Sequence, residues 1–291
     1  MKIALAQYPI GQFASLEDWQ ANAARWVGEA AAAGARLLVF PEYGDMELAS
    51  LLPPALQSDL RGQIPALAQF HDHFIETYAA LARRHDVFIL APSLPLESGG
   101  TYHNNACLFG PTGMECQRKR QMTRFETEEW GITGGSELKV FDIGVCKLGI
   151  AICYDIEFPL IAHAMAQAGA DLILAPSCTD TLAGSNRVHV GARARALENQ
   201  VYVAVAPTVG LAPWSPAVDV NRGWAAVYAT PDRGFPDDGV LARGEIDVPG
   251  WVFCELDFAL LRAARSNAQV FTRADWETQA LPGLEVTQTR F

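Results

Sequence analysis

Lys147-Leu-Gly-Ile-Ala-Ile-Cys-Tyr-Asp-Ile-Glu-Phe-Pro159 is the stretch of sequence that decides the fold. An apolar, strand-like pattern stops at the thiol of Cys153, polar residues follow, and a helical pattern begins at Pro159. This pattern is typical of a strand-to-helix elbow, which exposes a side chain at the carboxyl edge of a sheet. The stretch therefore predicts an α/β fold with a candidate nucleophile at a sheet edge.

The same order of elements occurs earlier in the chain, which indicates an internal repeat. Three successive segments match: 2–8 with 147–154, 33–42 with 168–177, and 84–93 with 198–208. A further strand is expected after each set, at 105–109 and at 225–228. The repeat predicts two equivalent halves of the form strand–helix–strand–helix–strand–strand.

The strands of both halves are apolar almost throughout, which requires burial on both faces. Helices are expected at about 15–33, 66–85, 159–167 and 186–199. If helices cover one face of each sheet and the two sheets cover each other, the fold is a four-layer α-β-β-α sandwich with a pseudo-two-fold axis. A single doubly wound sheet is the alternative, but it does not predict the repeat.

Length and charge narrow the class of protein further. The chain has 291 residues, is 50% hydrophobic and carries a net charge of -11, which argues against nucleic acid or an anionic membrane as partner. We expect a soluble, cytoplasmic protein, because no apolar run reaches the roughly 20 residues of a membrane span and the N-terminus lacks a signal-peptide pattern. We expect one domain at 1–260 and a C-terminal extension at 261–291 that packs on the domain or on a partner subunit.

The six cysteines contain no C-x-x-C pair, so neither a zinc site nor a redox motif is indicated. We expect them to be reduced thiols, since a chain of this length and cytoplasmic character does not need disulfides.

Polar residues at strand ends are the candidates for chemistry. Glu42 follows the apolar run that ends at Pro41, and Cys153 ends the first strand of the second half. Because ligands bind at the carboxyl ends of strands in α/β sheets, we expect both residues to face one pocket, although Glu42 could also be a solvated turn carboxylate. Lys119 is a third candidate, because a nearby ammonium lowers a thiol pKa from its usual 8.5 or so. Spacing alone leaves open a solvated basic cluster around Lys119.

The chain resembles the nitrilase (carbon–nitrogen hydrolase) superfamily over most of residues 1–260. The resemblance is carried by Phe40-Pro-Glu-Tyr43, by Lys119 upstream of Met122, and by Ile152-Cys-Tyr-Asp155 with Phe158-Pro159. It implies the same α-β-β-α sandwich. It also implies a thiol hydrolase that cleaves the carbon–nitrogen bond of a small linear amide, without a metal or cofactor.

The resemblance assigns a role to each residue of the set. Glu42 would be the general base, Cys153 would form a thioester acyl-enzyme, and Lys119 would stabilise the tetrahedral intermediate together with the backbone N–H of Tyr154. Nitrile or N-carbamoyl hydrolysis by the same triad, and a catalytically idle scaffold, are the alternatives. A Cys–His hydrolase using His103, His163 or His189 would leave Glu42 and Lys119 unexplained.

Family members often have a second glutamate after the lysine. Glu126, Glu128 and Glu129 are available, and we predict Glu128 from its place two residues before Trp130. Trp130, Thr179 and Asp180, together with Tyr43, are expected to line the substrate pocket.

The family's usual Arg-Phe-Pro-Glu after the cysteine is Glu157-Phe-Pro-Leu160 in this chain, which argues against transfer of the ω-amidase or carbamoylase substrates. The segment from Met122 to Trp130 resembles a branch in which some members are fused to an acetyltransferase domain. The resemblance also implies a homodimer or higher homo-oligomer formed through the helices at 159–167 and 186–199.

Overall fold

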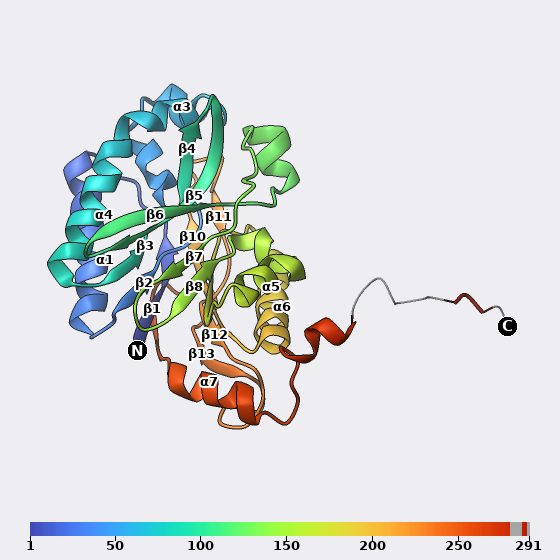
Figure 1. The fold of residues 1–291 in the computed structure, drawn as a ribbon. Helices are drawn as coiled ribbons and strands as arrows, with labels where there is room; N and C mark the ends of the chain where they lie inside the picture. Colours follow the sequence, from blue (N-terminus) through green and yellow to red (C-terminus); the bar gives the residue numbers. More distant parts are fainter. Residues whose placement is uncertain (280–286, 290–291) are drawn as a thin grey trace.

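A curled sheet whose two halves face each other lies between two pairs of helices in the computed structural model, which describes residues 1–279 and 287–289 (Figure 1). The strands of the first half are β1 (Lys2–Pro9), β2 (Leu37–Val39), β3 (Phe88–Leu90), β4 (Leu94–Ser98), β5 (Thr101–Gly110), β6 (Gly113–Arg118) and β14 (Gly250–Glu255). Those of the second half are β7 (Val140–Asp142), β8 (Lys147–Ile150), β9 (Leu172–Ser177), β10 (Tyr202–Leu211), β11 (Val220–Asn221), β12 (Ala226–Tyr228) and β13 (Val240–Arg243).

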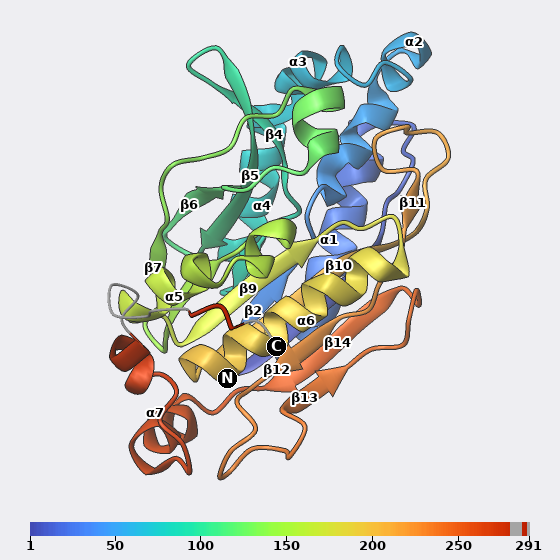
Figure 2. The same ribbon diagram turned by 90° about the vertical axis from the view of Figure 1, so that its right-hand side faces the viewer.

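The helices form the two outer layers. They are α1 (Leu16–Ala32), α2 (Pro54–Gln57), α3 (Gln63–Leu67), α4 (His71–His85), α5 (Pro159–Gln167), α6 (Leu182–Asn199) and α7 (Phe258–Asn267). Helices α1 and α4 cover the first half, and α5 and α6 cover the second half on the opposite side (Figure 1). Figure 2 views the molecule from the side of α6, which lies along β9 and β10.

Strand pairing confirms the repeat. In the first half β1 pairs with β2 and β2 with β3 in parallel, and β3 pairs with β5 antiparallel. In the second half β8 pairs with β9 and β9 with β10 in parallel, and β10 pairs with β12 antiparallel. Each first strand also has an antiparallel neighbour, β14 beside β1 and β7 beside β8. The order strand–helix–strand–helix–strand–strand is therefore present twice.

Alternating side chains of β1 show how the layers meet. Ile3 and Leu5 are fully buried in a core shared with the strands of the second half. Ala4 and Ala6 face the other way and pack in the core under α1 and α4. Because successive residues of a strand point to opposite faces, one strand contributes to both cores. This packing confirms the four-layer α-β-β-α sandwich.

The two halves join where β1 and β10 run side by side in parallel, at Tyr8 opposite Thr208 and Pro9 opposite Val209. These residues lie at or near the carboxyl ends of their strands. The junction therefore brings together the edges of the sheet at which the sequence places its polar residues.

Side-chain caps mark the starts of α1 and α6. Ser15 caps α1 by accepting the N–H of Asp18, and Gly34 follows the helix with a φ of 85°. Helix α5 has the predicted bounds. Helix α6 begins four residues earlier than predicted, because Thr181 caps it by accepting the N–H of Gly184.

The expectation of six reduced cysteines is wrong. Cys107 and Cys116 form a disulfide, while four other cysteines are free. The bonded pair lies directly opposite on the antiparallel strands β5 and β6. The pairing depends on strand register, which the spacing of the cysteines does not reveal.

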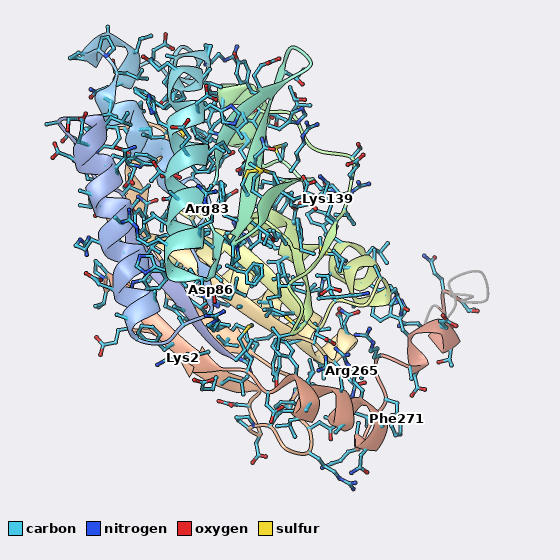
Figure 3. The ribbon with its side chains drawn as sticks, turned by 60° about the vertical axis from the view of Figure 1, so that its left-hand side comes forward. Lys2, Arg83, Asp86, Lys139, Arg265 and Phe271 are labelled. Carbon is cyan, nitrogen blue, oxygen red and sulfur yellow. A yellow bond between two sulfur atoms is a disulfide. The ribbon has the colours of Figure 1, made fainter. Side chains whose placement is uncertain are left out.

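Residues after β14 pack on the second half of the domain. Arg262 and Arg265 of α7 form ion pairs with Asp171, and Figure 3 shows Arg265 on this helix. Trp276 stacks on His163 of α5 with ring centroids 4.0 Å apart. Helix α7 runs across residue 260, and the predicted division of the chain at that residue stays a prediction. Residues 280–286 and 290–291 of the predicted extension lie outside the described residues. In the part of the chain that the structure describes, no helix combines the length and the apolar character of a membrane span.

Candidate active site

Glu42 lies just beyond β2, in a turn that is hydrogen-bonded to the last residue of β3 and to the segment after it. The N–H of Phe40 donates to the carbonyl of Leu90, and the N–H of Ser93 donates to the carbonyl of Pro41. The Glu42 side chain is 1% exposed. A solvated turn carboxylate is therefore excluded, and the residue needs the compensating partners that a buried carboxylate requires.

Cys153 starts a short 3-10 helix that ends at Glu157 and connects β8 to α5. Its φ is 48°, in the left-handed region that residues with a Cβ rarely adopt. The strained backbone turns the chain sharply, as a nucleophile elbow does. The thiol is buried and lies 3.6 Å from the carbonyl oxygen of Cys178.

Asp155 holds this elbow in place, a role that sequence reasoning missed. Its carboxylate accepts hydrogen bonds from the backbone N–H groups of Ile152 (3.3 Å), Arg120 (3.1 Å) and Gln121 (2.7 Å). Burial raises the pKa of Asp155 to about 6, against the effect of these donors. The elbow is thus tied to the segment that directly follows Lys119. The only signal in the sequence was the position of Asp155 two residues after the cysteine.

Lys119 follows the last residue of β6 and is 1% exposed. Its Nζ lies 2.7 Å from Glu42 Oε1 and 2.7 Å from each carboxylate oxygen of Glu126. Lys119 is therefore a buried cation between two carboxylates, and the interpretation as a solvated basic cluster does not hold for it. Its neighbours in sequence, Arg118 and Arg120, are exposed.

The structure places Glu126 beside Lys119, so the prediction of Glu128 is corrected. Glu126 is buried and accepts a hydrogen bond of 2.6 Å from the Tyr43 hydroxyl, whereas Glu128 lies on the surface and pairs with Arg124. Both glutamates belong to a π-helical turn that spans Phe125–Trp130. Residues four apart share one face of a helical turn, so Glu126 points inward with Trp130 and Glu128 points outward.

Glu42, Lys119 and Glu126 shift one another's pKa. Burial raises the pKa of Glu42 to about 7, with Lys119 acting against this rise and Glu126 adding to it. Burial favours the neutral form of Lys119, but the two carboxylates outweigh it and hold the pKa of the ammonium above its usual range. The pKa of Glu126 is lowered by Lys119 despite burial. The set can thus hold one cation between two carboxylates, one of which exchanges a proton near neutral pH.

The thiol pKa differs from the expectation drawn from a nearby ammonium. Burial raises the pKa of Cys153 well above its usual value, Glu42 raises it further, and Lys119 lowers it only in part. The thiol is therefore protonated at rest and requires a base at the moment of attack. Glu42 has the position and the proton affinity for that role.

A cavity of about 290 Å³ lies above the three residues. Its lining includes Trp130, Thr179 and Asp180, which were predicted for the pocket, and Tyr154, which was predicted as an oxyanion donor. Tyr43 also lines it and packs against Trp130 with ring centroids 4.7 Å apart. Sequence reasoning did not find the other lining residues, among them Cys178, Glu157, Arg187, Val188 and the segment 216–220.

The three histidines considered as bases lie elsewhere. His103 bonds to the carbonyl of Thr133, and His189 bonds to the Tyr228 hydroxyl. His163 packs against Trp276. None of them is among the described residues that line the cavity, which removes the geometric basis for a Cys–His pair.

Comparison with known proteins gives relatives over most of this chain. Residues 2–230 match the family model described as carbon-nitrogen hydrolase. The probable hydrolase YhcX of Bacillus subtilis is 32% identical over 93% of this chain, which spans about half (52%) of that protein's length. The omega-amidase NIT2 of Homo sapiens is 25% identical, with 93% of each chain covered.

Solved structures share the fold at lower identity. Nit3 of Saccharomyces cerevisiae superposes with a TM-score of 0.72 at 22% identity, covering 93% of this chain and 94% of that one. A carbon-nitrogen hydrolase of Helicobacter pylori gives a TM-score of 0.77 at 19% identity, covering 97% and 98%. These matches support the same sandwich architecture.

Proposed function

Because this chain belongs to the carbon–nitrogen hydrolase family of the nitrilase superfamily, we propose that it hydrolyses a small linear amide through a thioester on Cys153. The observation that carries the proposal is the convergence of Glu42, Lys119 and Cys153 on one buried cavity, with Lys119 Nζ 2.7 Å from Glu42 Oε1. Glu42 and Lys119 lie 77 residues apart in sequence and meet there with 1% of each side chain exposed.

The first half-reaction forms the acyl-enzyme. Glu42 takes the thiol proton while Cys153 Sγ attacks the amide carbon, and the resulting oxyanion is stabilised by Lys119 and the Tyr154 N–H. Each such donor is worth about 3–4 kcal/mol in comparable sites. Glu42 then returns the proton to the leaving nitrogen, the carbon–nitrogen bond breaks, and ammonia or an amine departs.

The second half-reaction uses the same base. Glu42 takes a proton from water and the hydroxide attacks the thioester carbon. The carbon–sulfur bond then breaks to release the carboxylic acid, and Glu42 returns the proton to the departing thiolate. Amide and water are consumed, and acid and amine are formed. Glu126 holds Lys119 in place by accepting from its Nζ at 2.7 Å throughout this cycle.

An amide substrate is supported by the relatives, among which omega-amidases recur. The same triad can also hydrolyse a nitrile or an N-carbamoyl amine. These reactions are distinguished by the group that remains on the thiol, which makes the acyl-enzyme the most direct readout.

The test is a mass measurement of intact protein after brief exposure to a panel of amides, carbamoyl amines and nitriles. We expect a substrate-dependent mass increase on Cys153, with hydrolysed acid appearing in the solution. Cys153→Ser removes the thioester, and Cys178→Ser is the matched control that keeps the nucleophile. Labelling of the Cys153→Ser variant equal to that of the wild type would overturn the assignment of the nucleophile.

A catalytically idle scaffold is the second class of function. It would leave Cys153 no more reactive toward iodoacetamide than Cys178, although both thiols line the same cavity. We expect faster alkylation of Cys153, because its thiol interacts with the Glu42 carboxylate, which can accept its proton.

We also propose a homo-oligomer that forms through α5 and α6. Leu160 and Val190 are apolar and 63% and 69% exposed on these helices. A partner subunit packed on α5 and α6 would cover both side chains and remove their apolar surface from water. Sedimentation of the wild type against a Leu160→Arg/Val190→Arg variant tests this: a monomer in both would contradict it.

A further inference from the structure

A chain of hydrogen bonds runs from the backbone of Tyr43 to the carboxylate of Glu42 through two buried side chains. The N–H of Tyr43 donates to Ser93 Oγ (2.9 Å), and the Ser93 hydroxyl donates to Asn104 Oδ1 (2.6 Å). Asn104 Nδ2 then donates to Glu42 Oε1 (2.9 Å). Ser93 and Asn104 are both fully buried.

The direction of the bonds is fixed by the Glu42 carboxylate at the end of the chain. An ionised carboxylate can only accept, so the Asn104 NH₂ group faces Glu42. The Asn104 amide oxygen then faces Ser93, and the Ser93 hydroxyl donates to it while accepting from the N–H of Tyr43. The amide orientation follows from this network.

Asn104 also holds the main chain of Lys119. Its backbone carbonyl accepts the N–H of Lys119 at 2.9 Å, which continues the pairing of β5 with β6. A single residue therefore contacts the candidate base through its side chain and the lysine through its main chain. A shift of Asn104 would move the two groups relative to each other.

The electrostatic surroundings of Glu42 explain why a neutral donor is useful at this position. The titratable groups that face Glu42 are Lys119, Glu126, Cys153, Cys178 and Tyr43. The lysine is shared between two carboxylates, so it neutralises only one of them. The Asn104 amide stabilises the Glu42 anion without adding a charge that would also act on Cys153.

We propose that Ser93 and Asn104 are positioning residues that keep Glu42 ionised and its second oxygen directed to the thiol. With Oε1 occupied by Asn104 and Lys119, the remaining oxygen, Oε2, accepts the N–H of Cys178 (3.0 Å), the residue whose carbonyl oxygen lies 3.6 Å from the Cys153 thiol. The inference rests on the proposed role of Glu42 as the base, and it adds the pair that prepares Glu42 for that role.

The test measures the rate at which iodoacetamide alkylates Cys153 as a function of pH, read from the mass of the peptide that contains it. The variants are Asn104→Ala and Ser93→Ala. Asn105→Ala is the matched control, because the Asn105 side chain donates to the carbonyl of His103 and not to Glu42. Circular dichroism and thermal unfolding establish that each variant is folded.

In Asn104→Ala we expect the midpoint of the pH profile to move upward by about one to two pH units, because the Glu42 anion loses a donor. The rate below the midpoint should fall about 10- to 100-fold. Ser93→Ala should shift the midpoint in the same direction by a smaller amount, and Asn105→Ala should leave it unchanged. A purely structural role would reduce the labelled fraction without moving the midpoint.

A midpoint in Asn104→Ala that coincides with that of the wild type would overturn the inference. If this variant does not fold, Ser93→Ala decides, since it keeps Asn104 in the chain. Failure of the proposed function gives a different result: Glu42→Gln would then have the same pH profile as the wild type. If Glu42→Gln changes the pH profile but the midpoint of Asn104→Ala equals that of the wild type, only the positioning role is refuted.

Discussion

Replacing Glu126 by glutamine tests the electrostatic arrangement of the site with a change of one charge and almost no volume. The Glu126 carboxylate accepts from Lys119 through both oxygens, from the Tyr43 hydroxyl, and from the N–H and hydroxyl of Thr123. All five contacts are made by donors. Whichever way a glutamine amide turns, its NH₂ group faces at least one donor that cannot accept in return.

The magnitude follows from the burial of these contacts. Removing one partner of a buried ion pair costs about 3–5 kcal/mol. Lys119 keeps Glu42 as a second partner, which places the expected loss at the lower end, about 3 kcal/mol. If this loss acts fully on the transition state, the rate of acylation falls on the order of 100-fold. Since Glu126 raises the pKa of Glu42, the acidic limb of the pH profile should also move to lower pH.

The assay is single-turnover acylation of Cys153 by the best amide of the panel, measured across pH. Glu128→Gln is the matched control, because its side chain is exposed and paired only with Arg124, and exposed pairs contribute little. We expect its rate to stay within about twofold of the wild type. A larger loss in Glu128→Gln than in Glu126→Gln would refute the assignment of the second glutamate.

Four further outcomes are expected. Activity should fall as pH drops through about 7, because Glu42 must be deprotonated to act as base and its pKa is raised to about 7 by burial; a pH–rate profile measures this, and Glu42→Gln should abolish turnover. Burial raises the pKa of Glu47 to about 8, so the folded state binds more protons than the unfolded state between about pH 4.5 and 8. The free energy of unfolding should therefore fall as pH rises from about 4.5 to 8. Glu47→Gln should flatten this pH dependence, as measured by urea titrations. Glu157→Arg should raise the rate on anionic amides relative to neutral ones by about tenfold, as measured by competition, because a carboxylate at the cavity is replaced by a cation. Unfolded protein alkylated without reductant should gain four labels and, after reduction, six, since Cys107 and Cys116 form a disulfide.

Much of the architecture could be predicted from the sequence, because it depends on local patterns of apolar and polar residues. The apolar strands that match in order predicted the repeat, and strand pairing reproduces it in both halves. The elbow at Cys153 was predicted from the change of pattern at one residue. Side-chain caps mark the starts of α1 at Ser15 and of α6 at Thr181, and the predicted start of α6 lies four residues after the start that its cap allows.

The site could be predicted only in part, because only some of its residues follow a local sequence pattern. Glu42 and Cys153 follow apolar strands, which gives each a local signal. Glu126 and Glu128 lie two residues apart in one acidic run, and no local feature tells which of them is buried. Asn104 and Asp155 act through contacts with residues far away in sequence, so their roles had no signal beyond their place in a motif.

By itself, then, the sequence determined the repeated α/β order, the position of the thiol at an elbow and the family to which the chain is similar. The tertiary structure alone decided that Lys119 is buried between two carboxylates, that the second of these is Glu126, and that the thiol pKa is raised and not lowered. The physical reason is the range of the interactions. Strand and helix patterns arise from neighbours along the chain, whereas burial and electrostatic coupling depend on which segments the fold brings within a few ångströms of one another.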